Sequence, residues 1–194
     1  MDSDQIWAVI DAQRADLADL LDGLSPEQWT APSLCDGWRV RDVASHLTHS
    51  HMSPLRAMVE AARSGFRFDP MIRRLALEDS RSQAQITAAL RGMVGSRKKI
   101  LGTTDRDPLM DILVHGQDIA VPLGIDRPMP TDAAVEVANH MWHMRFPMNP
   151  SKRLQGVRLL ATDVDFAVGA GSEMRAPNRD LVMVIAGRAD IEPA

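Results

Sequence analysis

The strongest constraint on the fold is a change in the spacing of apolar residues about three-quarters of the way along this 194-residue chain. Before the Pro-Met-Asn-Pro segment at 147–150, apolar residues recur at intervals of three and four, which is typical of helices that bury one face. After it, Val164, Phe166 and Val168 alternate with polar or small residues, which is the spacing of a strand. The chain is therefore predicted to be α+β. Several antiparallel helices occupy residues 1–147, and a small α/β segment occupies 148–194.

Capping residues and helix breakers set the expected helix ends. The predicted helices cover residues 3–22, a short turn from 26, 39–63, 73–101 (best ordered over 79–100), 105–121 and 131–145, with Ser3 or Asp4, Ser25, Asp105 and Thr131 as their caps. Pro54 either kinks or divides the helix over 39–63, because proline lacks the backbone N–H that a helix interior needs.

In the C-terminal segment, the Gly-Ala-Gly-Ser sequence at 169–172 predicts a hairpin turn between a strand over 164–168 and a second strand over 173–175. Residues 181–186 are compatible with either a helix or a strand. The flanking Pro177, Asp180 and Gly187 favour a short helix, which is the prediction adopted.

Composition excludes several classes of protein. The net charge is −4 and no long cluster of Lys and Arg is present, so a nucleic-acid partner is not expected. With one cysteine there is no disulfide framework. The acidic N-terminus does not resemble a signal peptide, and no apolar stretch is long enough to cross a bilayer. We therefore expect a soluble, cytoplasmic protein that does not bind membranes.

The most specific chemical signal is a carboxylate and an imidazole four residues apart, at Asp111 and His115. On a helix these two side chains lie on one face, about one turn apart. His46, predicted on another helix, could supply a third ligand. Two histidines and one carboxylate form a divalent metal site of the catalytic type, in which water or substrate completes the coordination. The alternative is a half-buried ion pair without a metal.

Neighbouring side chains suggest how such ligands are oriented. Asp118 is three residues after His115 and is predicted to accept a hydrogen bond from its imidazole. Asp42 is four residues before His46, and either orients that ring or caps the start of its helix. Cys35 is either structural or close to the metal.

Four other histidines are less specific. His140 and His143 are expected at a helix end near the surface. His49 and His51 follow His46, and His49 is the better placed of the two to approach the site.

Two segments carry a family resemblance: Leu-Cys-Asp-Gly-Trp-Arg-Val-Arg-Asp-Val-Ala-Ser-His-Leu at 34–47, and Leu-Val-His-Gly-Gln-Asp-Ile-Ala at 113–120 with Leu-Gly at 123–124. A weaker match runs from 156 to 163 and leads to the Ala-Gly-Arg of 186–188. Together they resemble the mycothiol-dependent maleylpyruvate isomerase family, within the larger DinB-like group of metal-binding helical bundles.

The resemblance implies a DinB-like four-helix bundle followed by a smaller α/β segment. It also implies a divalent metal, in the first instance zinc, held by His46, His115 and the carboxylate one turn earlier. That carboxylate is usually Glu in the family and is Asp111 here. The implied thiol is mycothiol. Arg188, at the end of the third match, is the candidate catalytic cation for an anionic substrate, the alternative being a charge at the end of a helix.

These expectations combine into a metal-dependent mycothiol S-transferase or isomerase that acts on small electrophilic substrates. The expected partners are the small-molecule thiol and its electrophile, and a homodimer is kept as an open alternative. Two other functions remain: a DinB-like metal-binding protein without turnover, and a hydrolase that uses zinc-bound water. The number of protein ligands discriminates among them, since a fourth protein ligand favours a structural metal.

Overall fold

The computed structural model describes residues 1–100 and 102–189. The N-terminal elements are α1 (Ser3–Asp22), α2 (Pro26–Thr30), α3 (Val40–Thr48), the 3₁₀ turn η1 (His49–His51), α4 (Pro54–Arg63), α5 (Phe68–Leu77), α6 (Gln83–Arg91), α7 (Arg106–Ala120), the 3₁₀ turn η2 (Val121–Leu123) and α8 (Thr131–Trp142). The C-terminal elements are α9 (Pro150–Arg153), β1 (Gly156–Ala161), β2 (Ala167–Gly169), β3 (Gly171–Ala176) and α10 (Asn178–Ile185). The predicted α+β class is confirmed.

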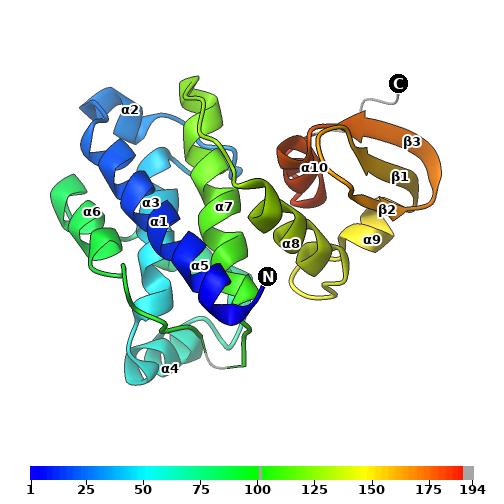
Figure 1. Ribbon diagram of the computed structural model, residues 1–194. Coiled ribbons are helices and arrows are strands. Elements are labelled where there is room, and N and C mark those ends of the chain that lie inside the picture. The colour runs from blue at the N-terminus through cyan, green and yellow to red at the C-terminus, as the bar shows by residue number, and fades with distance from the viewer. Residues whose placement is uncertain (101, 190–194) are drawn as a thin grey trace.

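Four helices form the bundle. α1 and α3 each pack against both α6 and α7, while α8 joins α7 to α10 (Figure 1). The small sheet lies beyond α8 and α10, away from α6. Apolar side chains from α1, α3, α6, α7, α8 and α10 nevertheless belong to one continuous buried cluster. The boundary expected between residues 147 and 148 stays a prediction.

Local sequence explains most helix starts. The Ser25 side chain accepts from the Gln28 backbone, and the Gln28 side chain accepts from the Ser25 backbone, which is a complete capping box. The cap of α1 is Asp2, rather than the predicted Ser3 or Asp4. Asp105 and Pro130 occupy the positions before α7 and α8, and neither helix has a side-chain cap.

Two predicted helices are each divided. The helix expected over 39–63 ends at Thr48 and restarts at Pro54, because Pro54 favours an extended Ser53, whose hydroxyl then caps α4. The helix expected over 73–101 is wrong as a single element. Ser82 and Gln85 form a capping box that starts α6, and α6 ends at Arg91 before Gly92. The predicted end of that helix, Leu101, lies outside the described residues.

The hairpin predicted at Gly169–Ser172 is wrong, because β2 and β3 do not pair with each other. Both pair with β1, which is the central strand: β2 is antiparallel to it and β3 is parallel, in the order β2-β1-β3. The antiparallel hairpin is formed by β1 and β2, and residues 162–166 connect them. The helix predicted over 181–186 is confirmed as part of α10.

Candidate metal centre

α7 presents a carboxylate and an imidazole toward α3. Asp111 and His115 lie one turn apart, with Asp111 Oδ1 3.9 Å from His115 Nε2. Residues on the other faces of this helix, such as Leu109 and Leu113, are fully buried in the core. Their packing fixes the rotation of α7, so the chain positions both polar side chains through apolar contacts made elsewhere on the same helix.

His46 reaches the same place from α3. Its ring centroid lies 4.9 Å from that of His115, with the two planes at 84°. The Trp38 ring also packs against His46 in a T-shaped arrangement, with 5.5 Å between the ring centroids. One donor atom from each of His46, Asp111 and His115 falls within 4.8 Å of the other two. The three residues predicted as ligands are therefore brought together.

The surroundings of this triad suit a cation. His46 Nδ1 is buried and has no hydrogen-bond partner among the described residues. Burial raises the pKa of Asp111, so this carboxylate also lacks full compensation for its loss of water. Asp111 and His115 expose 33% and 14% of their side chains, so solvent reaches the cluster from one side. Two imidazoles and a carboxylate fit zinc and other divalent transition metals.

The second nitrogen of His115 is held by Asp118. His115 Nδ1 lies 2.8 Å from Asp118 Oδ2, and the Asp118 side chain is fully buried. Burial by itself lowers the pKa of His115, but hydrogen bonds with Asp118 and Cys35 outweigh burial and raise it to about 10. Asp111 and Asp118 thus favour positive charge at this imidazole, either as a proton or as a cation bound at Nε2.

Arg188 extends this contact into the C-terminal segment. Its Nε donates to Asp118 Oδ1 at 2.9 Å, and its side chain keeps 25% of its surface exposed. Burial tends to raise the pKa of Asp118, but the hydrogen bond and charge of His115 and the charge of Arg188 outweigh it and lower that pKa. A chain of contacts therefore joins Arg188, Asp118 and His115 in that order.

Cys35 also belongs to this chain of contacts. Its Sγ lies 3.1 Å from Asp118 Oδ2, 3.4 Å from Arg188 Nη2 and 3.8 Å from His115 Nδ1. It is a free, buried thiol. The loop before α3 carries it there, because the Leu34 backbone N–H donates to the Asp118 carbonyl of α7. Cys35 therefore lies next to His115, one of the three predicted metal ligands, as expected for a cysteine close to the metal.

Comparison with known proteins gives the family. A family model described as the mycothiol maleylpyruvate isomerase N-terminal domain matches residues 10–120, which is more than half of the chain. The chain belongs to this family. His46, Asp111 and His115 all fall inside the matched residues, whereas Arg188 lies beyond them. No curated protein matched.

Two solved structures resemble the whole chain. They are the mycothiol-dependent maleylpyruvate isomerase, at 12% identity, and a variant of it with one histidine replaced by alanine, at 11% identity. Each comparison has a TM-score of 0.56 and covers 97% of this chain and 90% of the other. At this identity the likeness shows that the fold is shared. None of the described helices combines the length and apolar character of a membrane span.

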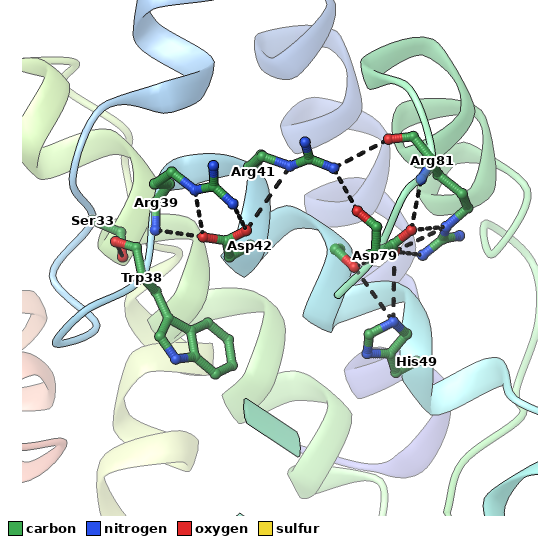
Figure 2. Close-up of polar contacts among 9 residues, drawn as sticks. Ser33, Trp38, Arg39, Arg41, Asp42, His49, Asp79 and Arg81 are labelled. Atoms are coloured by element: carbon green, nitrogen blue, oxygen red, sulfur yellow. Dashed lines mark hydrogen bonds and ion pairs between the residues drawn. The ribbon is translucent and has the colours of Figure 1, made fainter. Parts of the chain in front are cut away.

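In this member of the isomerase family, Asp42 does not join the ligand cluster. Asp42 Oδ2 accepts from both the backbone N–H and Nε of Arg39 at 2.9 Å, and Oδ1 accepts from Arg39 Nη2 at 3.0 Å (Figure 2). Of the two alternatives, orienting His46 or capping its helix, the contacts correspond to the cap. The reason is direction: the buried carboxylate points back along α3, away from the ring one turn later.

The remaining histidines lie outside the triad. His49 Nε2 is 3.7 Å from Asp79 Oδ2, and its ring centroid is 6.5 Å from that of His46. Burial first, and then the charge of Arg81, lower its pKa to about 4. His140 Nε2 lies 3.4 Å from Asp107, and His143 Nδ1 contacts the Asn139 carbonyl. No spacing in the sequence indicates the contact between His49 and Asp79, because the two residues are far apart along the chain.

Proposed function

We propose that this protein is a divalent-metal-dependent enzyme that uses mycothiol to act on a small electrophile, as an S-transferase or an isomerase. One observation carries the proposal: His46, Asp111 and His115 converge within 4.8 Å in the part of the chain that the isomerase-family model matches. Zinc is the proposed metal, because imidazole and carboxylate ligands suit it.

The number of ligands favours turnover over a structural metal. In the described part of the chain, the triad contributes three donor atoms and no fourth protein donor joins it. A three-ligand site leaves a position for water or substrate. A divalent metal held there supplies Lewis acidity and lowers the pKa of a thiol ligand.

The surrounding residues have proposed roles in holding this geometry. Asp118 fixes His115 through Nδ1, which leaves Nε2 directed at Asp111. Arg188 uses Nε and Nη2 for Asp118 and Cys35, and its exposed part is available to a substrate carboxylate. Arg188 is therefore the proposed substrate-binding cation, while Asp42 is proposed to act only through the stability of α3.

In the proposed isomerisation, substrate and product have the same atoms, and the thiol is regenerated. A bound thiolate would supply the nucleophile: its sulfur would add to one carbon of an activated double bond, and the π electrons would move into the activating carbonyl. After rotation about the resulting single bond, return of the electrons would expel the same thiolate. For S-transfer, a proton from solvent would be taken up by the adduct in place of the elimination, and the thioether would be released.

The test is turnover of a panel of electrophiles with mycothiol or a simple thiol, after metal analysis of the purified protein. We expect stoichiometric metal, turnover with mycothiol, and a loss of about a hundredfold or more in Asp111→Ala, since that variant removes a ligand. Asp165→Ala, an exposed aspartate in the loop before β2, is the matched control and should retain full activity.

Three results would contradict the proposal. Equal turnover in wild type and Asp111→Ala would mean that the metal takes no part in the chemistry. Full metal occupancy, with no electrophile converted in the presence of any thiol, would favour the alternative that the protein binds metal but is not an enzyme. Hydrolysis of activated esters in the absence of thiol, abolished by Asp111→Ala, would favour the hydrolase. Sedimentation of the same preparation would show whether the protein is the homodimer that the sequence left open.

A further inference from the structure

A hollow that the proposed metal ligands do not line lies beside the C-terminal end of α3. It is a cavity of about 480 Å³ between the end of α3 with η1, α4, α5 and the α5–α6 loop. This volume is within the range of small-molecule sites. His46, Asp111 and His115 do not line it, whereas His49 does. The cavity is therefore separate from the proposed metal ligands, and His49 of η1, whose ring centroid lies 6.5 Å from that of His46, stands between them.

Two carboxylates in the cavity wall already accept hydrogen bonds from neighbouring side chains. Glu60, on α4, accepts from Arg74 Nη2 at 2.6 Å and from Arg63 Nη1 at 3.4 Å. Asp79 accepts from Arg81 Nε at 3.0 Å and from its backbone N–H at 2.9 Å, and it also binds the Ser45 hydroxyl (Figure 2). Both carboxylates are less than one-tenth exposed. Neither has free capacity to neutralise further positive charge.

The guanidinium groups of the wall still have N–H donors available for a ligand. Each has five N–H donors, and Arg63, Arg74 and Arg81 expose 66%, 27% and 34% of their side chains. Arg56, on the exposed side of α4, makes no ion pair with any residue in 1–100 or 102–189. Apart from the two imidazoles, four guanidinium groups and three carboxylates line the wall. The cavity therefore offers an excess of donors and one excess positive charge.

We propose that this cavity binds a small organic monoanion with one carboxylate and several hydroxyl or carbonyl oxygens. The excess of a single positive charge favours one carboxylate over a phosphate dianion, and a guanidinium matches a carboxylate with two parallel hydrogen bonds. Arg56 anchors the carboxylate because it has no competing partner. Arg81 and Thr48, which are joined by a 2.8 Å hydrogen bond, line the inner wall and meet the remaining oxygens. Binding there does not require the metal centre.

The experiment is a titration of the full-length protein with glucuronate, followed by backbone amide NMR, with glucose as the uncharged control ligand. We expect saturable shifts at Thr48, His49 and Arg81 with glucuronate, and at least tenfold weaker binding of glucose. Arg56→Gln should weaken glucuronate binding by about tenfold, as loss of a charge-assisted hydrogen bond does. Arg67→Gln removes an exposed arginine that does not line the cavity and should leave the affinity unchanged.

Ser80→Phe is a second variant that narrows the cavity without changing its charge, and it should also weaken binding. Both cavity variants should otherwise reproduce the wild-type amide spectrum, which shows that they fold. Three results would overturn the proposal: no saturable shift with glucuronate, unchanged affinity in Arg56→Gln, or shifts confined to residues around His115.

Discussion

At the scale of single residues, His115 has a different partner on each ring nitrogen. Nδ1 faces the buried Asp118, and Nε2 faces Asp111 across 3.9 Å. Because the first contact fixes the ring, the second nitrogen can be presented to a ligand without the entropic cost of ordering a free side chain. The chemistry of the site therefore depends on residues that do not themselves touch the proposed metal.

Replacing Asp118 by Asn tests this dependence. Asn keeps the shape of the side chain but removes the charge that holds His115 Nδ1 and Arg188 Nε. We expect the affinity for zinc to fall by about 10- to 100-fold, the usual effect of losing such an outer hydrogen bond, in a competition titration with a chromophoric chelator. Asp42→Ala is the contrasting variant: it should lower the melting temperature but leave zinc affinity unchanged. Equal zinc affinities in wild type and Asp118→Asn would refute the positioning role.

Asp107, in the first turn of α7, makes one contribution to the pH dependence of stability. Burial tends to raise its pKa, but hydrogen bonds from His140 and Thr104 outweigh it and lower the pKa to about 2. Since an unfolded Asp titrates near 3.9, this group contributes at most about 2.5 kcal/mol to stability above pH 4. That contribution is lost as the pH falls from about 4 toward 2.

Urea unfolding of wild type and Asp107→Asn checks this contribution. The variant should be less stable by about 1 to 2 kcal/mol at pH 7, and the difference should shrink toward zero near pH 2. A difference in free energy of unfolding that stays constant across that range would show that the ionised carboxylate is not its source.

At the scale of elements, the link between β2 and β3 determines the strand order of the sheet. The chain leaves β2 at Gly169 and enters β3 at Gly171, on opposite sides of β1. A Cβ on Gly171 would overlap the backbone carbonyl of Gly156, and a Cβ on Gly169 would overlap that of Val157. Gly171 also has a φ of +125°, a conformation that L side chains rarely adopt. Both glycines are therefore required by close backbone approach.

Gly171→Ala should destabilise the protein by about 3 kcal/mol, because the added methyl group forces the central strand to move. Gly65→Ala is the matched control. Gly65 also has a positive φ, of +60°, but nothing lies within 4 Å of the added Cβ, so only backbone strain of about 1 kcal/mol is expected. Thermal unfolding followed by circular dichroism measures both, and equal effects would mean that steric overlap at β1 is unimportant.

At the scale of the whole molecule, the C-terminal segment reaches the bundle's ligand cluster through Arg188. This residue follows α10, and its guanidinium contacts Asp118 and Cys35, which come from α7 and the loop before α3. α10 itself packs on α8 and β1. The segment after residue 147 thus contacts the surroundings of the proposed metal site, whose three predicted ligands come from α3 and α7.

Arg188→Gln should therefore weaken zinc binding by about three- to tenfold, less than Asp118→Asn, because Asp118 would keep its contact with His115. Arg175→Gln, in the exposed part of β3, is the control and should bind zinc as wild type does. If Arg188 contacts only substrate and does not support His115, zinc affinity will be unchanged and the Michaelis constant alone will rise.

Features that depend on neighbours along the chain could be predicted before the structure. The spacing of Asp111 and His115 places both on one helix face, and Ser25 with Gln28 forms its capping box locally. Pro54 divides the helix expected over 39–63, because its ring removes a backbone N–H and disfavours a helical conformation at Ser53. The α+β order of elements follows from apolar periodicity in the same way.

Tertiary structure decided the rest, because it depends on contacts between residues far apart in the chain. The pairing of both β2 and β3 with β1 overrode a plausible hairpin signal at Gly169–Ser172, since turn residues specify a local bend and not the partner of a strand. Cys35 reached His115 through the docking of the loop before α3 on α7. His46 lies close to Asp111 and His115 because apolar side chains pack α3 against α7. Packing between segments that are distant along the chain follows no regular spacing, so the distance from His46 to the other two residues could not be predicted from the sequence.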